Sequence, residues 1–424
     1  MELKTKHWQV ALPTLPDGWQ ANTLEELSEF ITSGSRGWAR YYTDQGATFI
    51  RSQNVRNGRL DFSDHQCVTP PLGAEGSRTR VAIGDLLVTI TGNSVGNVAY
   101  VNQELGDAYI SQHVGLIRLR DPSRIDYICR YLAPGAPGNA QILACQSGQS
   151  KPGLNLRNLG DFWIALPHDS EIAAISTALS DIEKLIEGLA REITKRQSIK
   201  LATMQKLLSG ETRLPNFKNK WNTKTLGDHL KFIKNGVNSR AELSEVGDVK
   251  YLHYGDIHGM RSPSLNISDC NLPRLPATKA AGLDRLQDGD LVFADASEDL
   301  NGVGKAVEVF GVGKTEVVSG LHTIAVRFDK QVLADRFKGY LPFCPPFRNH
   351  LKRLASGTKV YATNKGHIAT VEMRLPEIDE QIAIAQVLSD MDMDIATVEA
   401  RLTKTRIIKL GMMQELLTGQ TRLI

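Results

Sequence analysis

The chain contains two copies of one long segment. Residues 147–214 align without a gap to residues 356–423, at an offset of 209, and 25 of the 68 aligned positions are identical. Composition alone gives roughly 4 identities in such a stretch. A period this long is that of a duplicated domain rather than of a solenoid repeat.

The repeat extends upstream in a fainter form. Matching residues lie at offsets that grow from 202 to 209, so the second copy has gained a few residues, which loops tolerate best. The pairs are Trp19 with Trp221, Gly34 with Gly236, Gly84-Asp85-Leu86 with Gly289-Asp290-Leu291, His113 with His322, and Arg118 with Arg327. The strongly matching part is therefore a scaffold, and the weakly matching part has been free to differ.

Each copy begins with a globule of mixed structure. In the first copy the pattern predicts a helix over residues 24–31, followed by short strands separated by Gly and Asp turns. The predicted strands are 48–50, 85–90, 96–101 and 113–120. The sequence thus predicts an α+β fold with two tandem mixed α/β domains.

Each globule is followed by a long amphipathic helix. Apolar residues recur there in steps of three and four, which is the pattern of a coiled-coil seam. The predicted packing residues are Ile175, Leu179, Ile182, Ile186, Leu189 and Ile193 in the first helix, and Ile384, Leu388, Met391, Ile395, Val398 and Leu402 in the second. The two stripes continue on a shifted seam through Leu201, Met204 and Leu208 in the first helix and Leu410, Met413 and Leu417 in the second.

The two helices are expected to pair with each other. Because they are duplicates, a pseudo-twofold axis would make them an antiparallel coiled coil with the globules at opposite ends. Asp169 or Ser170, and Asp379 in the second copy, are candidate N-caps, and Gly210 and Gly419 are candidate ends. The predicted division is 1–165 and 211–375 for the globular domains, and 166–210 and 376–424 for the helices.

Composition excludes several classes of protein. No stretch has the roughly 20 apolar residues that a membrane span needs. The five cysteines are scattered without a CxxC pair, so neither a zinc site nor a disulfide framework is predicted, and we expect a cytoplasmic protein without a signal peptide. The net charge is only +3, although residues 215–375 carry 23 basic and 17 acidic groups, a net of +6. This balance permits a nucleic-acid partner without requiring one.

Several motifs resemble those of the specificity subunits of type I restriction-modification systems. The match covers nearly the whole chain. Its most specific segments are Leu375-Pro376, 379–383, Leu388-Ser389-Asp390, Lys409-Leu410 and 413–419, together with Leu166-Pro167, Leu179-Ser180-Asp181, 204–210 and the lead 15–19 of the first copy. Ser170-Glu171-Ile172 departs from the usual acidic start of the helix.

The resemblance implies a non-catalytic subunit that recognises DNA. Two target-recognition domains would each read half of a bipartite site on double-stranded DNA. The paired helices would act as a spacer and dock two modification (N6-adenine methyltransferase) subunits, and restriction-translocase subunits would complete the complex. No cofactor is expected on this chain, since the partner methyltransferase would bind S-adenosylmethionine.

The candidate DNA contacts are polar residues of the predicted loops, because base reading needs hydrogen-bonding side chains on rigid loops. They are Arg36, Arg40, Tyr41, Arg51, Gln53, Asn54 and Arg56 in the first globule, Lys234, Asn238, Arg240, His253, Tyr254 and His258 in the second, and Gln149, Lys151, Thr358 and Lys359 in the loops before the helices. Residues 51–54 align with residues 253–256, a wholly different set of donors and acceptors. Two unlike readers predict an asymmetric target.

Three features that suggest catalysis have simpler interpretations. His113 and His322 recur in register without a nucleophile or carboxylate, so buried structural histidines are expected. Residues 310–315 resemble part of a P-loop, but the first glycine of that motif is replaced by Glu308, and a plain hairpin turn is the expected structure. Residues 344–347, Cys-Pro-Pro-Phe, resemble the adenine-gripping motif of methyltransferases, but Cys344 cannot supply its polarity.

Two other functions remain to be weighed against DNA recognition. A fused methyltransferase is disfavoured because its motifs are broken and a cofactor-binding domain is missing. The stronger alternative is a non-catalytic protein-interaction scaffold with two heads on a coiled coil. Sequence-specific retention of the assembled complex on DNA discriminates between a scaffold and a DNA reader.

Overall fold

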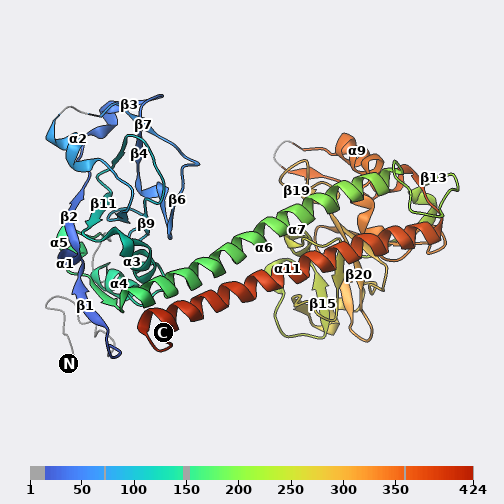
Figure 1. Ribbon diagram of the computed structural model, residues 1–424. Coiled ribbons are helices and arrows are strands. Elements are labelled where there is room, and N and C mark those ends of the chain that lie inside the picture. The colour runs from blue at the N-terminus through green and yellow to red at the C-terminus, as the bar shows by residue number, and fades with distance from the viewer. Residues whose placement is uncertain (1–14, 71–72, 147–152, 358–359, 424) are drawn as a thin grey trace. The chain divides into compact units, whose positions relative to one another are not determined.

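The computed structural model describes residues 15–70, 73–146, 153–357 and 360–423. The chain forms two compact units, one of Met1–Ala190 with Glu399–Ile424 and one of Arg191–Val398. Each unit contains one sheet-rich head and a part of both long helices (Figure 1). The mixed α+β fold predicted from the sequence is confirmed.

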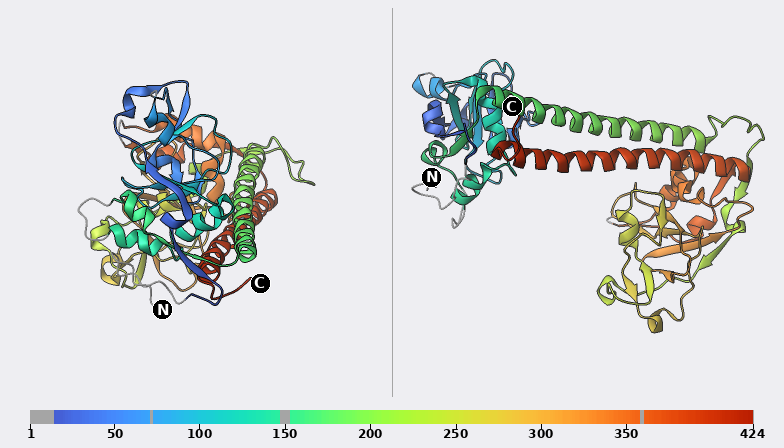
Figure 2. Two further views of the ribbon diagram at one scale, coloured as in Figure 1. Left: turned by 60° about the vertical axis from the view of Figure 1, so that its left-hand side comes forward. Right: turned by 60° about the horizontal axis from the view of Figure 1, so that its bottom comes forward.

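The long helices are α6, Asp169–Ser209, and α11, Ile378–Thr418, with 41 residues each. Within each unit they lie side by side and antiparallel (Figures 1 and 2). In the first unit Lys409 Nζ lies 2.7 Å from Glu183 Oε1. In the second unit Lys200 pairs with Asp392 at the equivalent positions. The duplication has therefore kept one interhelical ion pair in both halves.

The apolar seam of the helices holds most of the predicted packing residues. Ile182, Ile186 and Met391 are half-buried, and the other nine predicted packing residues are buried. Of the residues predicted for the last part of the seam, Met204, Leu208, Met413 and Leu417 are buried. The prediction is wrong for Leu201 and Leu410, which are 52% and 51% exposed.

The helix ends follow the sequence more closely than the starts do. Gly210 and Gly419 follow the last helical residues with φ of 74° and 71°, a left-handed conformation in which glycine ends helices. At the start of α6 the backbone amides of Glu171 and Ile172 bond to the carbonyl of His168. Asp169 and Ser170 consequently lie in the first turn rather than at the N-cap, and Asp379 does so in α11.

The first head is built from short elements. They are β1 Gln20–Thr23, α1 Leu24–Leu27, β2 Ser28–Ser33, η1 Trp38–Tyr41, β3 Tyr42–Thr43, β4 Ala47–Ile50, η2 Ser52–Asn54, β5 Val55–Arg56, β6 Arg59–Leu60, β7 Cys67–Val68, α2 Ala74–Thr79, β8 Asp85–Thr89, β9 Val98–Tyr100, β10 Ala108–Ile110, β11 Val114–Leu119, η3 Pro122–Arg124, α3 Ile125–Leu132, α4 Asn139–Gln146, α5 Leu156–Gly160 and β12 Trp163–Leu166. The helix predicted over residues 24–31 is only four residues long, because β2 begins at Ser28 and pairs with β11.

Two four-stranded sheets form the first head, in the orders β2-β11-β8-β9 and β10-β4-β7-β3. Alternate residues of β8 face opposite sides of the first sheet, as the two-residue period of a strand requires. Leu86 and Val88 join a core with α3, α6 and α11. Leu87 joins a separate core with Ile50 and Ile110 of the second sheet. The first sheet is therefore the middle layer of the head.

The second head repeats this topology with small additions. Its elements are β13 Asn222–Thr225, η4 Leu226–His229, β14 Leu230–Ile233, η5 Arg240–Glu242, β15 Val249–Leu252, α7 Tyr254–Gly259, β16 Ser264–Asn266, β17 Arg274–Leu275, α8 Ala277–Ala280, β18 Leu291–Ala294, β19 Ala296–Ser297, β20 Ala306–Phe310, β21 Val317–Ser319, β22 Thr323–Phe328, η6 Lys338–Phe343, α9 Pro345–Leu354, β23 Tyr361–Ala362, α10 Lys365–Ala369 and β24 Glu372–Leu375. The sheet orders are β14-β22-β18-β20-β16 and β17-β15-β21. Apart from the added β16 edge, the middle sheet has the strand order of the first head.

A buried ion pair recurs in the middle sheets and explains two of the faint repeats. Arg118 Nε lies 2.7 Å from Asp85 Oδ1, and Arg327 NH2 lies 2.7 Å from Asp290 Oδ2. Both carboxylates are 1% exposed. Because a buried carboxylate is costly without a partner, both residues of the pair had to be kept together.

A second contact recurs where each helix ends. In the first unit the guanidinium of Arg422 binds both oxygens of Glu171 at 2.7 and 2.8 Å, and its centre lies 5.9 Å from the ring of Trp19. Arg213 binds Glu380 in the second unit in the same way. The repeated Thr-Arg-Leu tripeptide thus ties the end of one helix to the start of the other within each unit.

The two sequences that resemble catalytic motifs lie in a connection between strands and at the start of a helix. Residues 311–316 connect β20 to β21, which belong to different sheets, so the expected hairpin turn is wrong. The two prolines of the Cys-Pro-Pro-Phe segment begin α9, where proline suits the first helical turn. Phe347 of that segment is fully buried and stacks on Phe293 at 5.8 Å.

No helix in the described part of the chain is long and apolar enough to cross a membrane. Among the same residues, no group of three or more His, Cys, Asp or Glu side chains is arranged to hold a metal ion.

Candidate nucleic-acid interface

In the first head several connections meet at the ends of β4 and β11. The amide of Ser111 bonds to the carbonyl of Ile50 at 2.9 Å, and the amide of Ile90 bonds to the carbonyl of His113 at 2.9 Å. We call residues 34–41, 51–54, 91–96 and 111–113 the first loop junction. It brings together the loop residues on which the sequence placed most of the candidate contacts.

The second head has an equivalent convergence, which we call the second loop junction, of residues 236–240, 253–259, 295–304 and 320–322. Gly236 donates to the carbonyl of Ser319 at 2.7 Å, and Gly320 donates to that of Leu252 at 2.8 Å. Asp295 donates to the carbonyl of His322 at 3.1 Å. The bonds made by Gly320 and Asp295 are the counterparts of the two main-chain contacts in the first head.

A repeated glycine is needed at both junctions. A Cβ on Gly34 would lie 2.3 Å from the carbonyl oxygen of Ile110, and one on Gly236 would lie 2.8 Å from the ring of Tyr251. Neither approach is possible for a residue with a side chain. The match between Gly34 and Gly236 therefore reflects close packing of the loop, against the main chain of Ile110 in the first head and the ring of Tyr251 in the second.

Three candidates of the first head lie on or beside η1. Trp38 anchors this helix by stacking on Phe49 at 5.2 Å. Arg36 and Arg40 are exposed, and the guanidinium of Arg40 lies 4.9 Å from the ring centre of Tyr41. The anchor leaves these two cationic side chains at the surface of the junction.

The candidates that follow β4 are largely held by hydrogen bonds. Arg51 NH2 lies 2.8 Å from Asp64 Oδ1, and Gln53 Nε2 donates to Asp64 Oδ2 at 2.6 Å. Both contacts lower the pKa of the Asp64 carboxyl, and the hydrogen bond from the Gln53 amide has the larger effect. Asn54 is 1% exposed, and its amide nitrogen donates to the backbone carbonyls of Asp61 and Asp64. Its side chain therefore holds the loop together and is not available at the surface. Arg56 lies on the β5–β6 hairpin, outside the junction.

The second head places most of its candidates around α7 and η5. Lys234 is exposed just before the junction. Arg240 NH1 lies 2.7 Å from Asp256 Oδ1 and its side chain is 58% exposed. Asn238 donates to Glu242, whose pKa is lowered to about 2 by the Ser239 amide and then by Asn238.

An aromatic cluster lies at the centre of the second loop junction. Tyr254 has ring-centre distances of 4.5 Å to His253, 6.1 Å to His258 and 5.4 Å to His322. Burial lowers the pKa of His253, which is 7% exposed. His258 Nε2 lies 2.7 Å from the carbonyl of Ala296.

The alignment of residues 51–54 with residues 253–256 has a structural basis. Asn54 Oδ1 accepts from the amide of Arg51 at 2.9 Å, and Asp256 Oδ2 accepts from the amide of His253 at 3.0 Å. Both side chains close the first turn of a short helix. The surface residues beside these caps differ completely between the two heads.

The histidines that recur between the heads are not buried, so that interpretation is wrong. His113 is exposed, with Nδ1 2.5 Å from Thr91 Oγ1. His322 is 53% exposed, with Nδ1 3.2 Å from Asp295 Oδ1. Each residue precedes its strand, β11 or β22, at the loop junction. Their recurrence in register beside a turn was the sequence signal that could have placed them in the candidate interface.

Four candidates cannot be placed. Gln149, Lys151, Thr358 and Lys359 lie outside the described residues.

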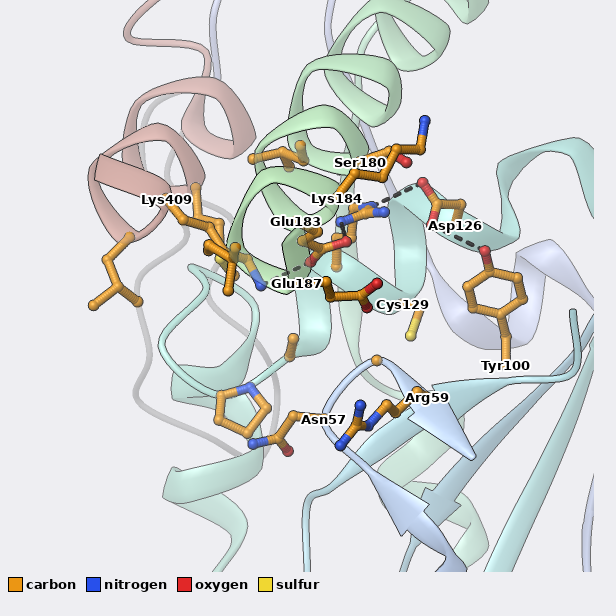
Figure 3. A pocket seen from close by; sticks show the side chains of 18 of the residues that line it. Asn57, Arg59, Tyr100, Asp126, Cys129, Ser180, Glu183, Lys184, Glu187 and Lys409 are labelled. Carbon is orange, nitrogen blue, oxygen red and sulfur yellow. Dashed lines mark hydrogen bonds and ion pairs between the residues drawn. The ribbon is translucent and has the colours of Figure 1, made fainter. Parts of the chain in front are cut away.

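A cavity of about 560 Å³ lies in the first unit between the head and its parts of α6 and α11 (Figure 3). Several of its charges are paired with one another: Arg130 bonds Asp126 Oδ2 at 2.8 Å and Glu183 Oε2 at 2.6 Å, and Tyr100 donates to Asp126 Oδ1 at 3.1 Å. Burial raises the pKa of the Cys129 thiol to about 12, so it stays protonated near neutral pH. These paired groups connect α3 of the head to α6.

Known proteins with the same architecture were found by sequence and by structure. No family model matches the chain. A protein of Methanocaldococcus jannaschii assigned as the MjaX specificity subunit of a type I restriction enzyme is 21% identical over 428 residues, which cover 96% of this chain and 95% of the relative. A solved chain from a study of assembly and conformational transition in a type I restriction-modification system has a TM-score of 0.59 at 16% identity, covering 96% of this chain and 100% of that chain. The chain has the specificity-subunit fold.

Two more solved structures share the specificity-subunit fold. The type I specificity subunit from M. genitalium has a TM-score of 0.53 at 14% identity, covering 95% of this chain and 97% of that chain. The HsdS subunit from Thermoanaerobacter tengcongensis has a TM-score of 0.51 at 16% identity, covering 96% and 99%. The resemblance noted in the sequence is confirmed, and it extends over nearly the full length of each chain.

Proposed function

We propose that the chain is the DNA-reading subunit of a type I restriction-modification complex and has no catalytic centre of its own. Residues 1–165 and 211–375 would be two target-recognition domains, and 166–210 and 376–424 would be spacer helices. The observation that carries this proposal is a duplicated scaffold with unlike loop junctions. One backbone presents Arg36 and Arg40 in the first head and Arg240 with the Tyr254 cluster in the second.

The chemistry of the junctions suits double-stranded DNA. Exposed arginines bind phosphates and the acceptor edge of guanine, and amide, hydroxyl and imidazole groups distinguish other bases. Because the side chains at the two junctions differ, the two half-sites are expected to differ in sequence. The target is then an asymmetric bipartite site.

The helices offer a surface for the partner subunits. Ile199 and Leu201 of α6 are 47% and 52% exposed, and their duplicates Ile408 and Leu410 of α11 are 45% and 51% exposed. Apolar side chains that stay exposed at the same register in both copies favour a protein contact that is made twice. We assign these pairs to two adenine methyltransferase subunits, which would bind S-adenosylmethionine, with restriction-translocase subunits joining the same complex.

A methylome tests the proposed function. The chain is co-expressed with its methyltransferase subunit in a host that lacks methylation, and N6-methyladenine is mapped by long-read sequencing. A single asymmetric bipartite motif is expected. An assembled complex that methylates no defined motif would contradict DNA recognition and favour the protein-binding scaffold.

Variants of the junctions sharpen that test. Arg40→Ala should relax the first half-site while the second half-site stays unchanged, and Arg240→Ala should do the reverse. Losing one arginine contact to a base reduces discrimination at that base pair about 10-fold. Arg157→Ala is the matched control, because Arg157 is a 77% exposed arginine of the first head that lies on α5, outside the junction.

A further inference from the structure

His322 adopts a conformation that histidine seldom takes. Its φ is 57°, in the left-handed region where a side chain with a Cβ is disfavoured. The residue lies between β21 and β22, and 53% of its side chain is exposed. Packing in a core therefore does not explain why His322 keeps this backbone conformation. Residues with strained backbones cluster at functional sites.

Two other elements fix the ring of His322. Nδ1 lies 3.2 Å from Oδ1 of Asp295, which follows β18. The ring of Tyr254 in α7 meets it edge to face, with an interplanar angle of 82°. Among the residues that the structure describes, no hydrogen-bond partner reaches Nε2 of His322.

These contacts define what the free ring nitrogen can do. A carboxylate only accepts hydrogen bonds, so Nδ1 of His322 is the protonated ring nitrogen and donates the hydrogen bond to Asp295. A neutral imidazole protonated at Nδ1 has its lone pair on Nε2. Nε2 is then a hydrogen-bond acceptor at the surface of the second loop junction.

The equivalent histidine of the first head is arranged differently. Nε2 of His113 lies 3.0 Å from Nε2 of the Gln112 amide, and Nδ1 lies 2.5 Å from Thr91 Oγ1. Both ring nitrogens of His113 thus have partners within its own junction. The free acceptor is a feature of the second head.

We propose that His322 reads a base of the second half-site, with Nε2 accepting a hydrogen bond from the exocyclic amino group of an adenine or a cytosine. The proposal rests on the DNA-reading function proposed above. In the major groove those two amino groups are the donors that adenine and cytosine present. Asp295 and Tyr254 are positioning residues, because they set the tautomer and the tilt of the ring without touching the base.

The test is methyl transfer by the full complex to synthetic duplexes that carry the mapped site. Each adenine or cytosine of the second half-site, apart from the adenine that accepts the methyl group, is replaced in turn by an analogue that lacks the exocyclic amino group. For one base, the wild-type complex should lose about 10-fold in rate. His322→Gly should lose about as much on the natural duplex and lose nothing more on that analogue. Glycine accepts a φ of 57°, so the backbone of the loop is kept.

Further variants separate positioning from folding. Asp295→Asn keeps an oxygen that accepts the Nδ1 proton and should retain most of the discrimination. Asp295→Ala should lose the discrimination as His322→Gly does. His113→Gly is the matched control, and it should leave the second half-site unchanged.

Two results would overturn the role of His322. One is an equal response of the wild type and His322→Gly to every amino-group deletion. The other is a loss confined to duplexes in which a guanine is replaced by 7-deazaguanine, which lacks the N7 acceptor; that result would make the ring a donor rather than an acceptor. In both cases the bipartite motif of the methylome would remain, whereas failure of the proposed function would leave no motif at all.

Discussion

The two heads have different residues at equivalent positions of their middle sheets. Tyr100 of β9 lies opposite Leu86, and Glu308 of β20 lies opposite Leu291, the counterpart of Leu86. Tyr100 donates to Asp126, which Arg130 also binds. Glu308 instead accepts from the amides of Arg336 at 2.5 Å and Gly339 at 2.9 Å. The backbone positions are shared, and each head has built its own polar network on them.

This difference shows what the duplication has to preserve. The buried carboxylate–arginine pair of the middle sheet and the arginine–glutamate contact at the helix ends are the same in both units. Both contacts satisfy charges that the fold buries. The side chains of the loop junctions, such as those of residues 51–54 and 253–256, have diverged instead.

The largest effect is expected from removing the arginine of the middle-sheet pair. Arg118→Leu should destabilise the first unit by about 3 kcal/mol, because Asp85 would stay buried without its cation. Arg327→Leu should cost the second unit a similar amount through Asp290. Urea unfolding followed by circular dichroism measures both costs, and values that differ by more than twofold would break the equivalence of the two heads.

The second effect distinguishes the heads by pH. Burial raises the pKa of Glu308 to about 7, above its ordinary value of 4.5. The stability that depends on protonated Glu308 is therefore fully present below pH 4.5 and is lost as pH rises through about 7, a change of about 3 kcal/mol. Glu308→Gln should remove this dependence.

Hydrogen exchange of η6 between pH 5 and 8 measures the change in the second head. Tyr100→Phe is the control in the first head, because burial raises the pKa of Tyr100 to about 12, outside that range. A pH slope that survives in Glu308→Gln would rule this explanation out.

A third, smaller effect is expected at the helix ends. Glu171→Gln should destabilise the first unit by about 1.5 kcal/mol, since a charge-assisted contact with Arg422 becomes a neutral one. Arg422 lowers the pKa of Glu171, so the contribution is present above pH 4.5 and is lost as pH falls through the lower folded value. Thermal melts at pH 7 and pH 3 should show the gap between variant and wild type closing at the lower pH.

The smallest effect on stability is expected on the helix surface. Ile199→Ser and Ile408→Ser should each change the free energy of unfolding by less than about 0.5 kcal/mol, because both side chains are exposed. Each should nevertheless reduce the number of methyltransferase subunits that co-purify with the chain, from two to one. Full occupancy in both variants, measured by native mass spectrometry, would contradict docking at these residues.

The repeat made the scaffold predictable from the sequence. A register fixed by 25 identities placed both long helices and ended them at the correct glycines. It also recovered Asp85 and Arg118 as matched positions, although their pairing became visible only in the sheet. The failures are local: β2 replaces half of the predicted first helix because it pairs with β11, which lies more than 80 residues further along the chain.

The candidate interface was less predictable, because its geometry depends on contacts between distant segments. Asn54 was a plausible base reader by residue type, yet the carbonyls of Asp61 and Asp64 engage its amide. His322 was interpreted as buried because it was expected inside an apolar strand, yet it precedes β22 in the loop with a left-handed φ and is 53% exposed. Neither outcome has a signature in the local sequence.

Gly34 and Gly236 have a consequence for how the reading surface can change. Each glycine donates its amide to a main-chain carbonyl of the connection beside it, and its close neighbours are the main chain of Ile110 and Ser111 at Gly34 and the buried ring of Tyr251 at Gly236. None of these neighbours is an exposed side chain of the junction. Residues such as Arg40 or Tyr254 can then be replaced without moving the frame that carries them. The exposed side chains of each junction can therefore change while the backbone keeps its shape. A change of target sequence then need not begin with a loss of stability.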